Sequence, residues 1–301
     1  ILNTYKYMFT KALITAAGRG TRFLPVVKGY AKELVPILNK PQIQYLVEEA
    51  IAAGITEICI VHRFSDNSLC DYFSPDSELT NYLAKINKLN AIQSLQQIWD
   101  SAKLSFIPQD PTLPYGNASP LLAAKSFIGT DHFVLMFGDD LIIEQEPGRY
   151  LKKIISTYEK YSPAIVASVK YVGPEEISRY GSAKYIKDPK YPNRIVGMFE
   201  KLPADKAPSF FGQGGRFVVN GAKIYPILVK QKLSQDNELW FADAVNTLAA
   251  ADIVITEATD KESDWMTTRD PLPWLKANKT VAHNDPNLAH EIKIYLEKNI
   301  K

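Results

Sequence analysis

Cysteine and histidine are scarce in this chain, which holds two cysteines and four histidines among its 301 residues. Cys59 lies within an apolar run and Cys70 follows it, and neither stands at a metal-binding spacing from a histidine. This scarcity argues against a disulfide framework and against a cysteine–histidine metal site. It is typical of a protein in a reducing, cytoplasmic location.

Excess charge of one sign and long apolar runs are also missing. The formal net charge is +2, from 35 basic and 33 acidic residues. No overall electric field would therefore draw the protein to nucleic acid or to an anionic membrane surface. No apolar run approaches the roughly 20 residues of a membrane-spanning helix. Because the chain opens with Ile1, we expect Met8 to be the natural start and residues 1–7 to be an addition to it.

What the chain does have is a regular alternation of two kinds of apolar segment. Short apolar runs predict strands at 12–17, 57–62, 103–109, 132–140 and 164–172. Apolar residues at helical spacing predict helices at 41–55, 82–102, 119–128, 147–161 and 237–251. The alternation predicts an α/β fold with a Rossmann-like sheet, mixed but mainly parallel, covered by helices on both faces.

The pattern of apolar residues changes between residues 174 and 235. Short apolar runs there are broken by proline, glycine and charged residues, which favours an inserted lobe with more antiparallel strands. The segment 271–301 reads as terminal helices. We therefore expect a main domain over residues 8–270, with the lobe inside it, and a helical C-terminal extension.

The segment Gly18-Arg19-Gly20-Thr21-Arg22 follows the first predicted strand. Ligands of α/β sheets bind beyond the carboxyl ends of the strands, where this segment would lie. Its glycines allow close approach of the backbone to a ligand, and arginine is a forked donor suited to phosphate. An ordinary strand-to-helix turn would have the same composition, and neither common phosphate-binding motif is present. Lys32, ten residues further on, adds a second cation and favours a polyphosphate site.

The strand predicted at 132–140 ends in Phe137-Gly138-Asp139-Asp140. Carboxylates at the carboxyl end of a strand can bind Mg²⁺, which bridges to phosphate oxygens in many nucleotide sites. A helix cap after the strand is the alternative interpretation. The cationic loop nearby favours the metal.

Several blocks together resemble one known family. They are AAGRGTRFLP, AKELVPILNKPQIQYLVEEAIAAGI, FGDDLI and FEKLP, and their order and spacing extend over nearly the whole chain. The sequence resembles the bacterial UTP–glucose-1-phosphate uridylyltransferases, within the sugar-nucleotide nucleotidyltransferases. The resemblance implies a nucleotidyltransferase catalytic domain over 8–270, whose inserted lobe at 174–235 binds the sugar. It implies transfer of a uridylyl group from UTP to glucose 1-phosphate, with Mg²⁺ as cofactor, giving UDP-glucose and pyrophosphate.

The resemblance also implies residue roles. The catalytic cations would be Arg22, Lys32 and Lys201. Nucleotide binding would involve Ala17, Gly18, Gly20, Thr21, Gln109, Gly116 and Asp139. The sugar phosphate would be bound by Gly181, Glu200 and Lys201, and the metal by Asp139 with Asp140 beside it. Glu238 and Asp243 match a later acidic block of the family, to which we assign no role.

The chain departs from the family pattern near its C-terminal third. A second metal-binding aspartate usually lies in a Tyr-Asp-x-Gly stretch, where this chain has Thr267 for the aspartate and Arg269 for the glycine. Asp264 or Asp270 could supply the missing carboxylate, or the metal could depend on phosphate oxygens and water. The loop glycine that the family often has at Ala118 is also absent, and Leu202 separates Lys201 from its usual proline.

These departures leave alternatives open. The enzyme could use dTTP or another sugar 1-phosphate, or the chain could be a catalytically weak nucleotide-sugar-binding protein. The resemblance implies a homo-oligomer, a dimer or a tetramer, in which the C-terminal helices pack on a neighbour. No nucleic-acid or membrane partner is expected.

Overall fold

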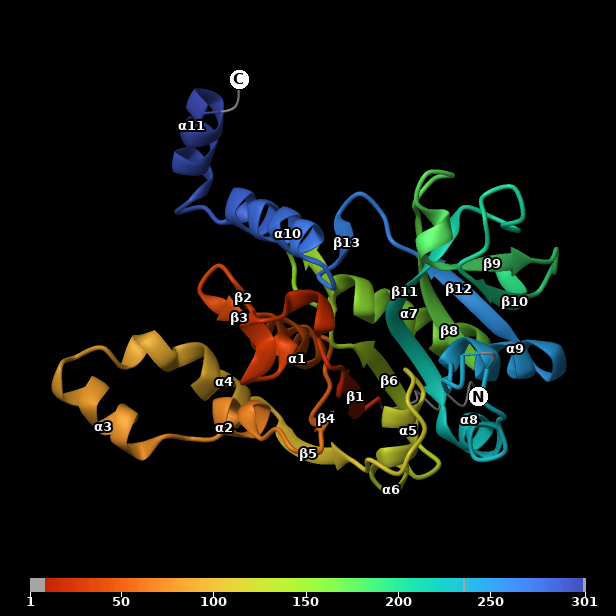
Figure 1. Ribbon diagram of the computed structural model, residues 1–301, viewed down its shortest axis with the longest axis horizontal. Coiled ribbons are helices and arrows are strands. Elements are labelled where there is room, and N and C mark those ends of the chain that lie inside the picture. The colour runs from red at the N-terminus through yellow and green to blue at the C-terminus, as the bar shows by residue number, and fades with distance from the viewer. Residues whose placement is uncertain (1–8, 235, 300–301) are drawn as a thin grey trace, which may run out of the picture.

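The computed structural model describes residues 9–234 and 236–299, so Met8 and the residues before it lie outside the described part. Within that part, nine strands form one mixed sheet in the order β5-β4-β1-β6-β11-β8-β12-β10-β9 (Figure 1). Pairing is parallel among β5, β4, β1 and β6 and between β8 and β12, and antiparallel where β11 meets β6 and β8. The mixed α/β architecture expected from the sequence is confirmed.

The strands of the main sheet have the following bounds: β1 (Lys11–Ala16), β4 (Glu57–Arg63), β5 (Lys103–Gln109), β6 (His132–Phe137), β8 (Ile165–Tyr171), β9 (Gly181–Tyr185), β10 (Arg194–Glu200), β11 (Phe211–Asn220) and β12 (Val254–Ala258). Small ribbons are formed by β2 (Pro36–Ile37) with β3 (Lys40–Pro41), and by β7 (Asp140–Glu144) with β13 (Ser263–Thr267). The strands between residues 174 and 235 therefore join the main sheet, through β9, β10 and β11.

The α-helices are α1 (Gln42–Ala52), α2 (Ser68–Phe73), α3 (Ser77–Lys85), α4 (Gln93–Ser101), α5 (Ser119–Ala123), α6 (Lys125–Ile128), α7 (Arg149–Tyr161), α8 (Gly221–Leu228), α9 (Phe241–Ala251), α10 (Pro271–Asn284) and α11 (Ala289–Asn299). Short 3-10 helices are η1 (Thr21–Phe23), η2 (Val26–Lys28), η3 (Lys32–Leu34), η4 (Leu89–Ile92) and η5 (Ile177–Arg179). Helix α10 packs beside β2, where Trp274 Nε1 donates to the Pro36 carbonyl at 2.9 Å, and α11 extends away from the sheet in Figure 1. No helix in the described residues has the length and apolar character needed to cross a membrane.

Helices cover both faces of the sheet because its strands are apolar on both sides. Within β1, Leu13 packs into one buried cluster, while its neighbours Ala12 and Ile14 pack into another. The first cluster draws on α8 and α9, and the second on α1 and α7. Alternate residues of a strand point to opposite faces, so each cluster is one of the two layers that cover a buried sheet.

The helices predicted at 82–102 and 119–128 are each divided in two, the latter into α5 and α6. The helical period at 82–102 is interrupted, since α3 ends at Lys85 and α4 begins only at Gln93. Asn87, between them, has the left-handed backbone angle φ of 56° that commonly ends a helix. Asp76 caps the start of α3, where its side chain accepts a hydrogen bond from the Leu79 amide at 2.9 Å.

Candidate active site

The glycine-rich loop after β1 forms one wall of a first cavity of about 370 Å³. A Cβ added at Gly18 would lie 3.0 Å from Lys32 Cε, and one at Gly20 would lie 2.9 Å from Lys32 Cβ. Gly20 also has a φ of 62°, which favours glycine. Only residues without a side chain let this loop lie directly against Lys32, so the loop and the lysine form a single site.

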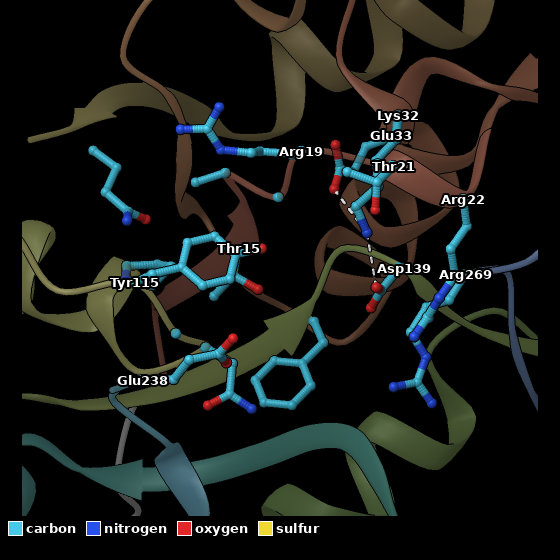
Figure 2. A pocket seen from close by; sticks show the side chains of 18 residues that line it. Thr15, Arg19, Thr21, Arg22, Lys32, Glu33, Tyr115, Asp139, Glu238 and Arg269 are labelled. Atoms are coloured by element: carbon cyan, nitrogen blue, oxygen red, sulfur yellow. Dashed lines mark hydrogen bonds and ion pairs between the residues drawn. The ribbon is translucent and has the colours of Figure 1, made fainter. Parts of the chain in front are cut away.

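Lys32 joins the loop to the carboxylates that follow β6. Its Nζ donates to Asp139 Oδ2 at 2.7 Å and lies 3.4 Å from Glu33 Oε1 (Figure 2). Burial alone would lower the pKa of Lys32, but the charges of Asp139 and Glu33 outweigh it and raise that pKa above its usual value. Burial raises the pKa of Asp139, but Lys32 and Arg269 outweigh it, so the net shift is downward. The lysine cation and the Asp139 carboxylate therefore stabilise each other's charged forms.

A tight turn carries Asp139 to this position. The predicted strand at 132–140 ends at Phe137, and a new strand, β7, begins at Asp140. The Gly138 amide donates to the Thr15 carbonyl at 3.0 Å, and a Cβ there would lie 2.4 Å from that oxygen. Glycine is required because the turn crosses β1 at backbone contact.

Asp140, the next residue, is almost fully buried. Burial and the charge of Asp139 raise the pKa of Asp140 to about 6. Its Oδ1 has no hydrogen-bond partner within the described residues. Arg216, fully buried on β11, donates to the Asp140 carbonyl at 3.0 Å and to both carboxylate oxygens of Glu49 at 2.9 and 2.7 Å. Sequence reasoning missed this pair, because Arg216 lies in an apolar strand and Glu49 in an ordinary helical stripe.

The opposite wall of the first cavity comes from β5 and the loop after it. Gln109, Tyr115 and Gly116 line this wall. In Figure 2, Tyr115 and Glu238 lie on the opposite side of the picture from Arg22 and Arg269. The loop is tied to the segment before α9 by paired backbone bonds, Leu239 N to Tyr115 O at 2.7 Å and Ala118 N to Leu239 O at 3.1 Å. The segment 237–240 is therefore a cavity wall, and the helix predicted from 237 begins only at Phe241.

Gly116 should not accept a side chain. Its φ is 136°, and a Cβ there would lie 2.3 Å from the Leu239 carbonyl oxygen. We expect Gly116→Ala to lower the free energy of unfolding by about 1–3 kcal/mol, the usual cost of such backbone strain. Urea titration followed by circular dichroism measures this loss. Gly29→Ala is the matched control, since nothing lies within 4 Å of its added Cβ; equal stability losses in the two variants would contradict the prediction.

A second cavity of about 150 Å³ adjoins the first. Shared residues line both cavities: Asn117, Phe137, Asp139, Glu238 and Arg269. Gly181, Glu200 and Lys201 line only the second, together with Trp240, whose ring centroid lies 5.8 Å from Lys201 Nζ. Burial raises the pKa of Glu200 despite the nearby charges of Lys201 and Arg269.

All the residues predicted for the site line one of these adjoining cavities. Those in the first are Ala17, Gly18, Gly20, Thr21, Arg22, Lys32, Gln109, Gly116 and Asp139, and those in the second include Asp140, Gly181, Glu200 and Lys201. Asp264 lines neither and pairs with Lys170 at 2.6 Å. Asp270 pairs with Arg22 at 3.3 Å and with Arg179 at 3.8 Å. Neither aspartate adds a carboxylate to the cavity lining.

The carboxylate oxygens in the two cavities could supply only part of the coordination of a metal ion. Asp139 faces both cavities, and the buried Oδ1 of Asp140 lacks a partner in the described residues. No group of three or more histidine, cysteine, aspartate or glutamate residues suited to a metal occurs within residues 9–234 and 236–299. A divalent ion at Asp139 would therefore complete its coordination with phosphate oxygens and water, which is usual for Mg²⁺.

Comparison with known proteins agrees with this geometry. The chain matches the nucleotidyl transferase family over residues 11–283. It is 33% identical to the UTP–glucose-1-phosphate uridylyltransferase YngB of Bacillus subtilis, covering 97% of this chain and 95% of that one. A UTP–glucose-1-phosphate uridylyltransferase of Streptococcus pyogenes is 35% identical over 95% of this chain and 94% of its own length.

Solved structures give the same result. A UTP-bound UDP-glucose pyrophosphorylase from Acinetobacter baumannii superposes with a TM-score of 0.85 at 30% identity, covering 98% of this chain and 100% of that one. A UDP-glucose pyrophosphorylase complexed with UDP-glucose superposes with a TM-score of 0.82 at 30% identity, covering 92% of this chain and 100% of that one. On its sequence, its fold and its cavity-lining residues alike, the chain belongs to the nucleotidyl transferase family.

Proposed function

We propose that this protein transfers the uridylyl group of UTP to glucose 1-phosphate, giving UDP-glucose and pyrophosphate. The observation that carries the proposal is the Lys32–Asp139 pair at the boundary of the adjoining cavities. The first cavity would hold the nucleotide and the second the sugar phosphate. The names of the similar proteins support these substrates, since one relative is UTP-bound and another is complexed with UDP-glucose.

In this reaction a phosphate oxygen of glucose 1-phosphate attacks the α-phosphorus of UTP. The bond between the α-phosphorus and the bridging oxygen breaks, and pyrophosphate leaves in line. The nucleophile is already an anion, so no general base is required. Catalysis then consists of alignment and charge neutralisation, which Lys32, Arg22 and Lys201 would supply.

Asp139 is the residue that we propose to hold Mg²⁺, with Asp140 beside it. When bound, the ion would neutralise phosphate charge. Lys32 would keep Asp139 ionised, because its cation lowers the pKa of that carboxyl. The backbone of Gly18, Gly20 and Thr21 would surround the triphosphate, and Gln109 and Gly116 would contact the base.

The proposal is tested by pyrophosphate release. The purified protein is incubated with glucose 1-phosphate, Mg²⁺ and either UTP or dTTP, and then with other sugar 1-phosphates in place of glucose 1-phosphate. We expect the largest kcat/KM for UTP with glucose 1-phosphate. A preference for dTTP or another sugar would favour a different specificity within the same class. Nucleotide binding without any release would favour a non-catalytic binding protein.

Arg22 offers a test of the cationic loop. Its side chain is 60% exposed and paired with Asp270, so it is less preorganised than Lys32. We expect Arg22→Ala to lower kcat/KM about tenfold, less than the loss typical of a fixed donor. Steady-state kinetics of pyrophosphate release measure this. Lys28→Ala is the control, since Lys28 lies outside the first cavity. An Arg22→Ala variant with the kcat/KM of the wild type would show that Arg22 takes no part in the mechanism.

The organisation of the whole protein belongs to the same proposal. Residues 8–270 would be the catalytic domain, with 174–235 as its sugar-binding lobe and 271–301 as a helical extension. We propose a homo-oligomer, a dimer or a tetramer, located in the cytoplasm. Light scattering combined with size-exclusion chromatography, on the full chain and on a chain ending at residue 285, tests the role of α11 in assembly.

A further inference from the structure

Arg269 stands where the family pattern has a glycine, yet it lies at the centre of the candidate site. It lines both cavities. Figure 2 shows it on the same side of the first cavity as Asp139 and Arg22. Arg269 places a permanent cation at the junction between the cavities. The sequence shows the departure, but only the fold shows where it lies.

Thr267, the other departure, holds Arg269 in place. The Arg269 Nε donates to Thr267 Oγ1 at 2.8 Å. Thr267 is itself fixed, because β13 pairs it directly opposite Asp140 of β7. The Arg269 guanidinium also lies over the Tyr180 ring, with its central carbon 5.9 Å from the ring centroid. Thr267 and Arg269 thus form one unit, in which the threonine orients the arginine.

The terminal amino groups of Arg269 have no partner in the part of the chain that the structure describes. Within residues 9–234 and 236–299, no hydrogen bond involves its terminal amino groups and no carboxylate lies within 4.0 Å of them. Its positive charge nevertheless acts on Asp139, Asp140 and Glu200. A fixed, partly buried guanidinium whose terminal amino groups are unpaired is suited to bind a phosphate group through two parallel hydrogen bonds.

From this arrangement we infer that Arg269, positioned by Thr267, binds the phosphate of the sugar 1-phosphate and supplies positive charge there without a metal ion. The inference rests on the proposed function. A guanidinium is always charged and needs no divalent ion, so it binds phosphate in the absence of metal. The chain should therefore bind glucose 1-phosphate when every divalent ion has been removed.

Calorimetry in EDTA, with glucose 1-phosphate and no nucleotide, tests the inference. We expect measurable binding to the wild-type protein and a dissociation constant roughly tenfold to a hundredfold higher for Arg269→Met, the range for one lost charge-assisted contact. Arg269→Lys, which keeps the charge but loses the fork, should lie between them. Thr267→Val should also weaken binding, and Thr267→Ser, which keeps the acceptor, should restore it. Free glucose should not bind detectably.

Arg149→Gln is the matched control. Arg149 donates to Ser263 Oγ at 2.6 Å and so contacts the same strand, β13, but it lines neither cavity. Its variant should bind glucose 1-phosphate as the wild type does. Equal dissociation constants for the wild type and a folded Arg269→Met, or no binding to the wild type in EDTA, would overturn the inference.

A second measurement does not depend on any variant folding. Phenylglyoxal modifies accessible arginines, and peptide mass spectrometry locates the modified residues. Glucose 1-phosphate in EDTA should protect Arg269 of the wild-type protein; modification of Arg269 at an unchanged rate would contradict the inference. Neither the calorimetry nor the modification experiment uses UTP or metal. A failure of the inference can therefore be told apart from a failure of the proposed reaction, which only the pyrophosphate assay tests.

Discussion

Lys32→Met should lower kcat for pyrophosphate release by roughly 10²–10³-fold, the loss typical of one preorganised charge-stabilising donor. Lys32 Nζ lies 2.7 Å from Asp139 Oδ2, and its side chain is only 16% exposed. Methionine has a similar length but no charge. The variant would leave Asp139 and Glu33 without their shared cation and the phosphates without a fixed positive partner. Steady-state kinetics at saturating UTP and glucose 1-phosphate measure the effect.

Lys40→Met is the matched control for this variant. Lys40 pairs with Glu48 at 2.6 Å, its side chain is 27% exposed, and it lines neither cavity. We expect this control to keep wild-type turnover. The far-ultraviolet circular dichroism of Lys32→Met should match the wild type, which separates lost catalysis from lost folding. A folded Lys32→Met with turnover within threefold of the wild type would exclude Lys32 from charge stabilisation.

Arg216→Met should lower the free energy of unfolding by about 3–5 kcal/mol, the usual cost of removing one partner of a buried ion pair. The Arg216 side chain has no solvent exposure, and that of Glu49 has 7%. Without the guanidinium, the Glu49 carboxylate stays in the core with no counter-charge, and the Asp140 carbonyl loses a donor. Urea denaturation followed by circular dichroism measures the loss.

A double variant makes the cause of this loss testable. Arg216→Met/Glu49→Leu removes both charges and should recover much of the lost stability, because an apolar pair of similar volume avoids the unpaired carboxylate. Lys152→Met is the surface comparison, since Lys152 is 48% exposed and pairs with Glu146 at 3.5 Å. Exposed ion pairs contribute about 0–1 kcal/mol. A loss in Arg216→Met no larger than that in Lys152→Met would contradict the expected cost.

Much of the site could be predicted from the sequence because its residues follow strands directly. The carboxyl ends of β1, β5 and β6 lead into the glycine loop, the loop at 110–118 and the turn at Asp139, so neighbouring strand ends bring them together. Gly18 and Gly20 indicated close approach of the backbone to a ligand, and in the structure the loop that carries them lies against Lys32. These patterns are local in the sequence, and the parallel part of the sheet brings the residues that carry them together in one site.

What the sequence did not predict depends on contacts between distant segments. The Glu49–Arg216 pair joins residues 167 positions apart, and neither residue has a local pattern that indicates its partner. The segment 237–240 becomes a cavity wall only because its backbone pairs with the loop at Tyr115. The interruption of the helix at Asn87 depends on a backbone angle that apolar periodicity does not encode.

The ribbon of β7 and β13 has a consequence for how the site can be varied. It is paired by its own backbone, apart from the main sheet, and its last register pair is Asp140 with Thr267. Side chains near that tip are not all free to change, because Thr268 is 3% exposed and donates to Gln42 Oε1 at 2.6 Å. If Arg269 binds phosphate as inferred, a mutant library that varies positions 267 and 269 and keeps Thr268 would sample charged and uncharged forms of one site.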